Sequence, residues 1–128
     1  MISRRQARRQ ALFLLYQWDL AGGGELGAQY AGEIDPWARR LAQDTADRAH
    51  ELDERITAAA EGWTADRLGV VERSALRLAI RELDRGEVPA EVAIDEAVAF
   101  AKRYSSEDAG RLVNGILGRI QREEAARR

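Results

Sequence analysis

Apolar side chains recur every three or four positions near the start of the chain, which is the spacing of one face of a helix. The positions that share this face are Ala7, Ala11, Leu14, Leu15 and Trp18. The spacing predicts a helix from Ser3 to Ala21, with Ser3 as its N-cap and the glycines at 22–24 ending it.

A second helical pattern begins at Asp35-Pro36, where an N-cap residue precedes a proline suited to the first helical position. We expect this helix to be long and to continue toward Gly62. The intervening segment 22–35 is rich in glycine, and we expect one short helix in it, near residues 26–31.

The same spacing continues in the C-terminal half of the chain. It predicts a core helix within residues 64–86, another within 88–105, and a last helix capped by Ser105 or Ser106. The dipeptide Asn114-Gly115 is typical of hairpin turns, but its neighbours keep helical spacing, so we expect helix there as well.

Three glycines at 110, 115 and 118 fall inside this last helix, where each costs roughly 1 kcal/mol relative to alanine. Two interpretations remain open at this stage. The glycines permit close packing of helices, or they leave room for a ligand.

Composition supports a helical fold. The chain has 128 residues, of which 45% are apolar, with two prolines and no cysteine. This predicts one all-α domain, residues 1–128, packed as an irregular bundle of helices. The lack of cysteine excludes disulfides and a thiolate metal site, and no apolar stretch is long enough to span a bilayer. We therefore expect a cytoplasmic protein with no membrane partner.

Charge is distributed unevenly along the chain. Residues 1–18 contain four arginines and no acid, a net +4, although the whole chain carries −2 and the remainder therefore −6. Arginine binds phosphates through paired N–H donors and stacks on bases, and Phe13 and Tyr16 are nearby aromatics. The pattern indicates one local anionic partner, with a merely solvated arginine face as the alternative.

Candidates for catalysis are few. His50 is the only histidine, and its spacing from Asp47 is one that helical metal ligands use, but one histidine cannot complete a di-iron site. The glycine-rich segment "AGGGELGA" lacks the strand and the lysine of a phosphate loop. We expect no enzyme, no metal and no cofactor.

The C-terminal half contains "LGVVERSALRLAIREL" and "EVPAEVAIDEAVAFAKRYSSEDAGRLVNGILGRI". These stretches, with the N-terminal "RRQARRQALFLLYQW", resemble the NusB family of transcription antitermination factors. Segment 22–60 does not match specifically. The resemblance implies about seven helices in two subbundles. It also implies binding of single-stranded boxA RNA, a heterodimer with the ribosomal protein NusE, and assembly with RNA polymerase and other Nus factors.

Site residues follow from the resemblance position by position. Those that it places on RNA are Arg4, Arg5, Arg8, Arg77, Asp108, Arg111 and Leu112, with Arg9 as an additional charge. We expect Arg5 and Arg8 to be removable without unfolding, since the apolar face of their helix is separate. Relatives can carry histidine and phenylalanine where this chain has Gly110 and Leu112, so a base-stacking aromatic is missing there.

Tyr16 and Glu72 match positions on the NusE-facing surface. Each has a simpler alternative: Tyr16 as a core residue, and Glu72 as a partner of arginines on its own helix. Asp108, likewise, suits the positive start of a helix. The acidic remainder of the chain suits a basic protein partner.

Two other functions compete with this interpretation. A NusB-like module of a ribosomal RNA methyltransferase would require a following α/β domain and a catalytic cysteine, and this chain has no cysteine. A purely structural helical oligomer would not bind RNA at all. Whether the free protein forms a homodimer stays open.

Overall fold

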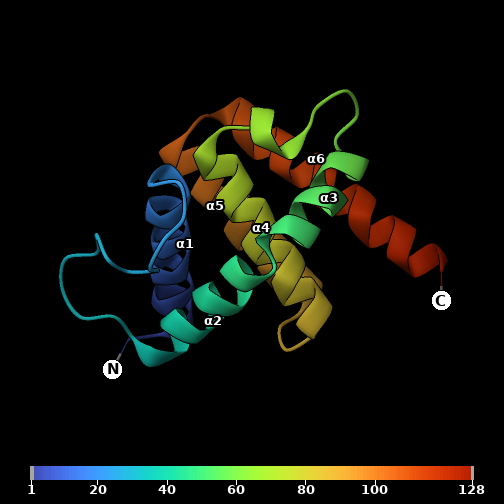
Figure 1. Ribbon diagram of the computed structural model, residues 1–128. Helices are drawn as coiled ribbons and strands as arrows, with labels where there is room; N and C mark the ends of the chain where they lie inside the picture. Colours follow the sequence, from blue (N-terminus) through green and yellow to red (C-terminus); the bar gives the residue numbers. More distant parts are fainter. Residues whose placement is uncertain (1, 128) are drawn as a thin grey trace.

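Six α-helices and one short 3₁₀ helix make up the computed structural model, which describes residues 2–127 (Figure 1). The elements in chain order are α1 (Arg4–Leu20), α2 (Pro36–Asp47), α3 (Ala49–Ala59), η1 (Ala65–Arg67), α4 (Val70–Arg85), α5 (Ala90–Tyr104) and α6 (Glu107–Ala126). The described residues contain no strand. The all-α prediction is confirmed, and the expected seven helices are reached when η1 is counted.

Helix starts agree with the caps that the sequence predicts. The Ser3 hydroxyl accepts a hydrogen bond from the Gln6 N–H, and the Gln6 side chain accepts one from the Ser3 N–H in return. The Asp35 carboxylate accepts from the Ala38 N–H at 3.1 Å, and Ser106 caps α6 in the same way. These side chains satisfy N–H groups that a helix start leaves without a partner.

Segment 22–35 differs from the prediction of a short helix. Residues 26–29 form turns, and Gln10 of α1 holds the segment instead, through Tyr30, the Glu33 carbonyl and the Asp35 N–H. Gly27, inside the expected helix, has φ +87°, which right-handed helix does not allow.

The long helix expected from Pro36 toward Gly62 is also wrong, because the chain breaks at Arg48. Arg48 has φ −109° and ψ 13°, and its guanidinium binds the Asp44 carboxylate one turn earlier. The break reorients α3, which then packs against α4 and α6. Neither glycine nor proline marks this position in the sequence.

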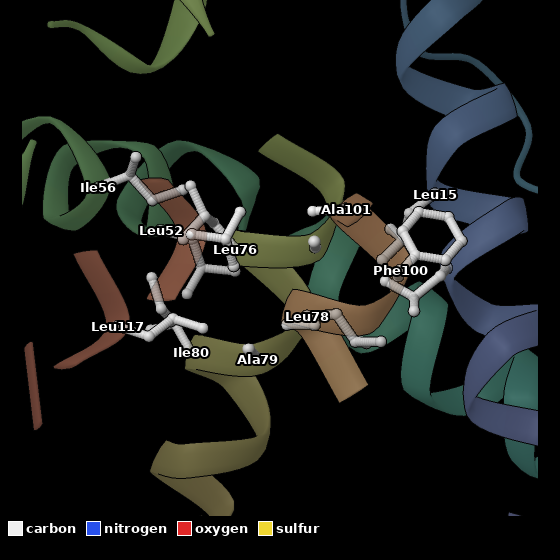
Figure 2. Packing of buried hydrophobic residues seen from close by; sticks show 14 of the residues in the cluster. Leu15, Leu52, Ile56, Leu76, Leu78, Ala79, Ile80, Phe100, Ala101 and Leu117 are labelled. Carbon is white, nitrogen blue, oxygen red and sulfur yellow. The ribbon is translucent and has the colours of Figure 1, made fainter. Parts of the chain in front are cut away.

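Helix α4 runs through the middle of the molecule and contacts α1, α2, α3, α5 and α6. Figure 2 shows two groups of side chains around it: Leu52, Ile56 and Leu117 gather near Leu76 and Ile80, while Leu15 and Phe100 lie near Leu78. All of them belong to one continuous buried cluster. Helix α4 contacts both groups, and the division into two subbundles stays a prediction.

The glycines of α6 have different surroundings. A Cβ atom on Gly110 would lie 2.4 Å from Cγ of Lys102, on α5, whereas one on Gly115 would meet nothing within 4 Å. Close helix packing therefore accounts for Gly110 and not for Gly115. None of the helices between residues 2 and 127 has the length and apolar content that a membrane crossing requires.

Candidate nucleic-acid interface

The four arginines of α1 divide between two sides of the helix. On one side, Arg5 Nε lies 2.9 Å from a Glu96 carboxylate oxygen on α5, and Arg9 lies one turn further along. On the other side, the Arg4 guanidinium lies 4.4 Å from the ring centroid of Trp37, on α2. The predicted arginine face is thus two surfaces that share one helix.

Arg8 is buried, with 4% of its surface exposed. Its Nε lies 2.8 and 3.0 Å from the two carboxylate oxygens of Glu82, on α4, and its guanidinium lies 5.7 Å from the Trp37 ring. The expectation that Arg8 is a removable surface charge is wrong, since its loss would leave Glu82 buried without a partner. A contact of Arg8 with RNA would require this ion pair to open.

Arg77 is buried too, and it lies away from the arginines of α1. It donates two hydrogen bonds of 2.7 Å to the carboxylate of Asp53, on α3, and lies 3.3 Å from Asp19, on α1. Its guanidinium is 5.8 Å from the Trp18 ring. In this structure Arg77 joins α1, α3 and α4, and its predicted contact with RNA remains a prediction.

A cavity of about 70 Å³ lies between α1 and α5, and we call it the α1–α5 groove. Its lining consists of Arg9, Leu12, Glu96, Ala99, Phe100, Arg103 and Tyr104. The Arg103 guanidinium lies 5.5 Å from the Tyr104 ring centroid, and Arg103 Nε–H donates to the Tyr104 hydroxyl at 3.2 Å. The groove combines cations with an exposed aromatic ring, as surfaces for single-stranded nucleic acid do.

Sequence reasoning did not identify Arg103 and Tyr104 as site residues. The signal available was the run "AKRYS", where basic and aromatic residues follow each other at the end of an apolar helix. Such a run is common on solvated helix ends, so only its position opposite Arg9 distinguishes it.

Asp108, Arg111 and Leu112 lie in the first two turns of α6. Asp108 and Arg111 form a close ion pair with both side chains exposed, and Leu112 packs partly buried against the core. Figure 1 shows the start of α6 beside the C-terminal end of α1, far from the N-terminus. The structure therefore does not bring these residues together with Arg4 and Arg5.

Tyr16 and Glu72 lie at one end of the molecule. Tyr16 is half-buried near the end of α1, where Asp19 binds Arg73 of α4 at 2.7 Å, next to Glu72. The Glu72 carboxylate lies over Gly69, because a Cβ there would be 2.3 Å from Glu72 Oε2. Glu72 forms no ion pair within residues 2–127, so the alternative of pairing with its neighbouring arginines is not observed.

The surroundings of His50 do not resemble an acid–base site. His50 lines an open cavity of about 460 Å³ with Asp53, Glu54 and Asp66, but Asp53 is bonded to Arg77. A side-chain hydrogen bond from Thr64 lowers the pKa of Asp66, which favours its charged form. The described residues contain no cluster of three potential metal ligands.

The fold and the site together define an all-α protein with a cationic groove between α1 and α5, which is suited to an anionic ligand. The chain belongs to the NusB family, whose model matches residues 5–122. Similar proteins include "Transcription antitermination protein NusB" of Solibacter usitatus, 39% identical over 96% of this chain and 91% of that protein. The protein of the same name in Rubrobacter xylanophilus is 41% identical over 91% of this chain and 88% of that protein's length.

Solved structures agree with this assignment. T. maritima NusB superposes with a TM-score of 0.82 at 35% identity, covering 95% of this chain and 92% of that one. A crystal structure of antitermination factors NusB and NusE in complex with dsRNA superposes with a TM-score of 0.80 at 31% identity, covering 94% of this chain and 96% of that chain.

Proposed function

We propose that this protein is a transcription antitermination factor that binds single-stranded boxA RNA and forms a heterodimer with NusE. The observation that carries the RNA part is the α1–α5 groove, where Arg9 and Arg103 lie beside an exposed tyrosine. A chain of net charge −2 gains affinity for phosphates only where its cations are concentrated. The solved complex of a similar NusB with NusE and dsRNA supports NusE and an RNA as the kinds of partner.

The RNA path that we propose follows the α5 side of α1. Arg5 and Arg9 supply phosphate contacts there, and Arg4 extends the cationic surface toward Trp37. At the other end of α1, Asp108, Arg111 and Leu112 are proposed to meet the same RNA strand. Arg8 and Arg77 contribute mainly by holding the helices in place, because both are buried in ion pairs.

The protein partner is proposed to bind at Tyr16 and Glu72. Glu72 is an acid without an ion pair in the described part of the chain, and Tyr16 is a half-buried aromatic on the adjoining helix. An acidic and aromatic surface suits a basic ribosomal protein. Contacts with RNA polymerase and other Nus factors, and a homodimer of the free protein, stay predictions.

We further propose that the protein acts without catalysis, as one domain, in the cytoplasm where transcripts are made. The single buried cluster that contains residues of every α-helix supports one domain. Alignment over 91% of a relative named as an antitermination protein supports this function over a module of a methyltransferase.

A binding titration tests the proposed function. Fluorescently labelled boxA RNA is titrated with the protein alone and with an equimolar mixture of the protein and purified NusE, and a scrambled RNA of equal length is the control. We expect tighter binding of boxA than of the scrambled RNA, and a further gain with NusE. Equal affinity for the two RNAs under both conditions would contradict the proposal.

A further inference from the structure

Trp37, near the start of α2, contacts α1 on the side away from the α1–α5 groove. The ring is half-buried, packs partly against the core, and has the Arg4 guanidinium 4.4 Å from its centroid. The indole N–H of Trp18 donates to the Gly24 carbonyl at 3.1 Å, whereas that of Trp37 is neither buried nor bonded within residues 2–127. Trp37 thus leaves the polar edge of its ring open to solvent.

Two free cations adjoin this ring. Arg40 is three positions after Trp37 in α2, so the two side chains are neighbours on the helix surface. Arg40 and Arg4 are both exposed, and neither forms an ion pair in the described part of the chain. The starts of α1 and α2 lie side by side in Figure 1. We call Arg4, Trp37 and Arg40 the α1–α2 surface.

The acids next to Trp37 and Arg40 are already paired. Glu82 and Glu87 line a small cavity beside Trp37, and Asp44 lies one turn after Arg40. Their partners are Arg8 for Glu82, Arg85 for Glu87 and Arg81 for Asp44. The two arginines of the α1–α2 surface are therefore left uncompensated. Free guanidinium groups around an aromatic ring suit a ligand that carries both phosphates and flat bases.

We propose that the α1–α2 surface binds RNA outside the boxA element, so that the strand passes over the start of α1 and continues onto α2. This proposal rests on the proposed function. Arg4 and Arg40 hold phosphates, while Trp37 keeps the Arg4 guanidinium in place and meets a base with its open edge. RNA fits better than an acidic protein, because Arg4 directly precedes Arg5 of the proposed boxA path.

The experiment compares a boxA RNA of minimal length with RNAs that carry an oligouridine flank upstream or downstream of it. Fluorescence anisotropy measures their affinity for the full-length protein. Arg40→Gln removes a cation that only the flank reaches. Arg122→Gln is the matched control, since Arg122 is also exposed, has no ion pair within residues 2–127, and lies on the far half of α6 (Figure 1).

We expect one of the two flanks to tighten binding by the wild type, and Arg40→Gln to reduce this gain while it binds minimal boxA normally. For the flanked RNA alone, Arg40→Gln should flatten the plot of log affinity against log salt by about 0.7, as the loss of one phosphate contact does. Arg122→Gln should leave both the gain and the slope unchanged.

The ring is tested separately. Trp37→Leu should weaken binding of the flanked RNA by about fivefold or more, and Trp37→Tyr, which keeps an aromatic ring, should restore it. Because Trp37 packs partly against the core, Trp37→Leu can lose stability, which circular dichroism detects. Arg40→Gln changes an exposed position and decides the proposal in that case.

Three results would overturn the proposal. The first is equal affinity of the wild type for minimal boxA and for both flanked RNAs. The second is the same salt slope in Arg40→Gln and Arg122→Gln. The third is an oligoglutamate peptide that binds the wild type and loses affinity in Arg40→Gln, which would assign the surface to an acidic protein. Failure of the flank alone leaves boxA binding intact, whereas a wild type that does not bind minimal boxA contradicts the proposed function itself.

Discussion

Arg5 and Arg8 lie less than one helical turn apart, yet Arg5 forms its ion pair at the surface and Arg8 forms its ion pair inside the protein. The Arg5 side chain is 74% exposed and meets Glu96 at the surface, where an ion pair contributes about 0–1 kcal/mol. The Arg8 side chain is 5% exposed and faces a Glu82 side chain that is 6% exposed. A buried carboxylate that loses its only cation keeps the cost of its desolvation.

We predict that Arg8→Gln lowers the free energy of unfolding by about 3–5 kcal/mol, because it leaves Glu82 charged and unpaired inside the protein. Arg5→Gln is the matched control and should change it by no more than about 1 kcal/mol. Urea denaturation followed by circular dichroism measures both. Equal stability of the two variants would show that Glu82 is accessible to water in solution.

The burial of Arg8 could not be predicted from the sequence. Its partner Glu82 lies 74 positions away, so no local pattern distinguishes Arg8 from Arg4, Arg5 or Arg9. Arg77 presents the same difficulty, since Asp53 and Asp19 belong to other helices. Residue type and resemblance indicated phosphate binding, and only the packing of α1 on α4 shows which arginines are available.

At the scale of elements, helix starts were the most predictable feature. A cap depends on contacts within about three residues, such as Ser3 with Gln6 and Asp35 with Ala38, so its signal is local. The break at Arg48 was not predictable, because no local residue requires it. It follows from the packing of α3 against α4 and α6, which the sequence pattern does not express.

The glycines of α6 provide a prediction at this scale. Gly115→Ala should stabilise the protein by about 1 kcal/mol, because its Cβ meets nothing within 4 Å and alanine is the better helix former. Gly110→Ala should gain less or destabilise, since its Cβ would meet the Lys102 stem at 2.4 Å. Thermal unfolding of the two variants compares them directly. A larger gain from Gly110→Ala would mean that α5 and α6 pack less closely.

Considered as a whole, the molecule separates its proposed phosphate contacts near the start of α1 from the proposed protein-binding residues near the end of this helix. Arg5 and Tyr16 are eleven positions apart, which corresponds to about 16 Å of helix. Arg73 and Arg77 bind Asp19 from α4 and so fix the C-terminal end of α1. An adaptor built in this way can hold RNA along the α5 side of α1 and a protein at Tyr16 and Glu72, with α1 and α4 as the rigid connection.

This separation predicts that charge reversal at Glu72 affects the two partners differently. Glu72→Lys should weaken NusE binding by about 2 kcal/mol or more, because it replaces a carboxylate with a charge that repels a basic partner. The RNA affinity of the protein alone should match that of Glu54→Lys, an equal change of charge at an exposed acid of α3. Folding should survive, since an acid near a helix start contributes only about 0.3–1 kcal/mol.

Combining Glu72→Lys with Arg9→Gln completes a double-mutant cycle. If Arg9 and Glu72 act independently, the losses of RNA affinity and of NusE affinity add within about 0.5 kcal/mol when each partner is titrated alone. Isothermal titration calorimetry of the wild type, the two single variants and the double variant provides four affinities for each partner. The assignment of Tyr16 and Glu72 to the protein partner is wrong if Glu72→Lys binds NusE as tightly as Glu54→Lys does while circular dichroism shows both folded.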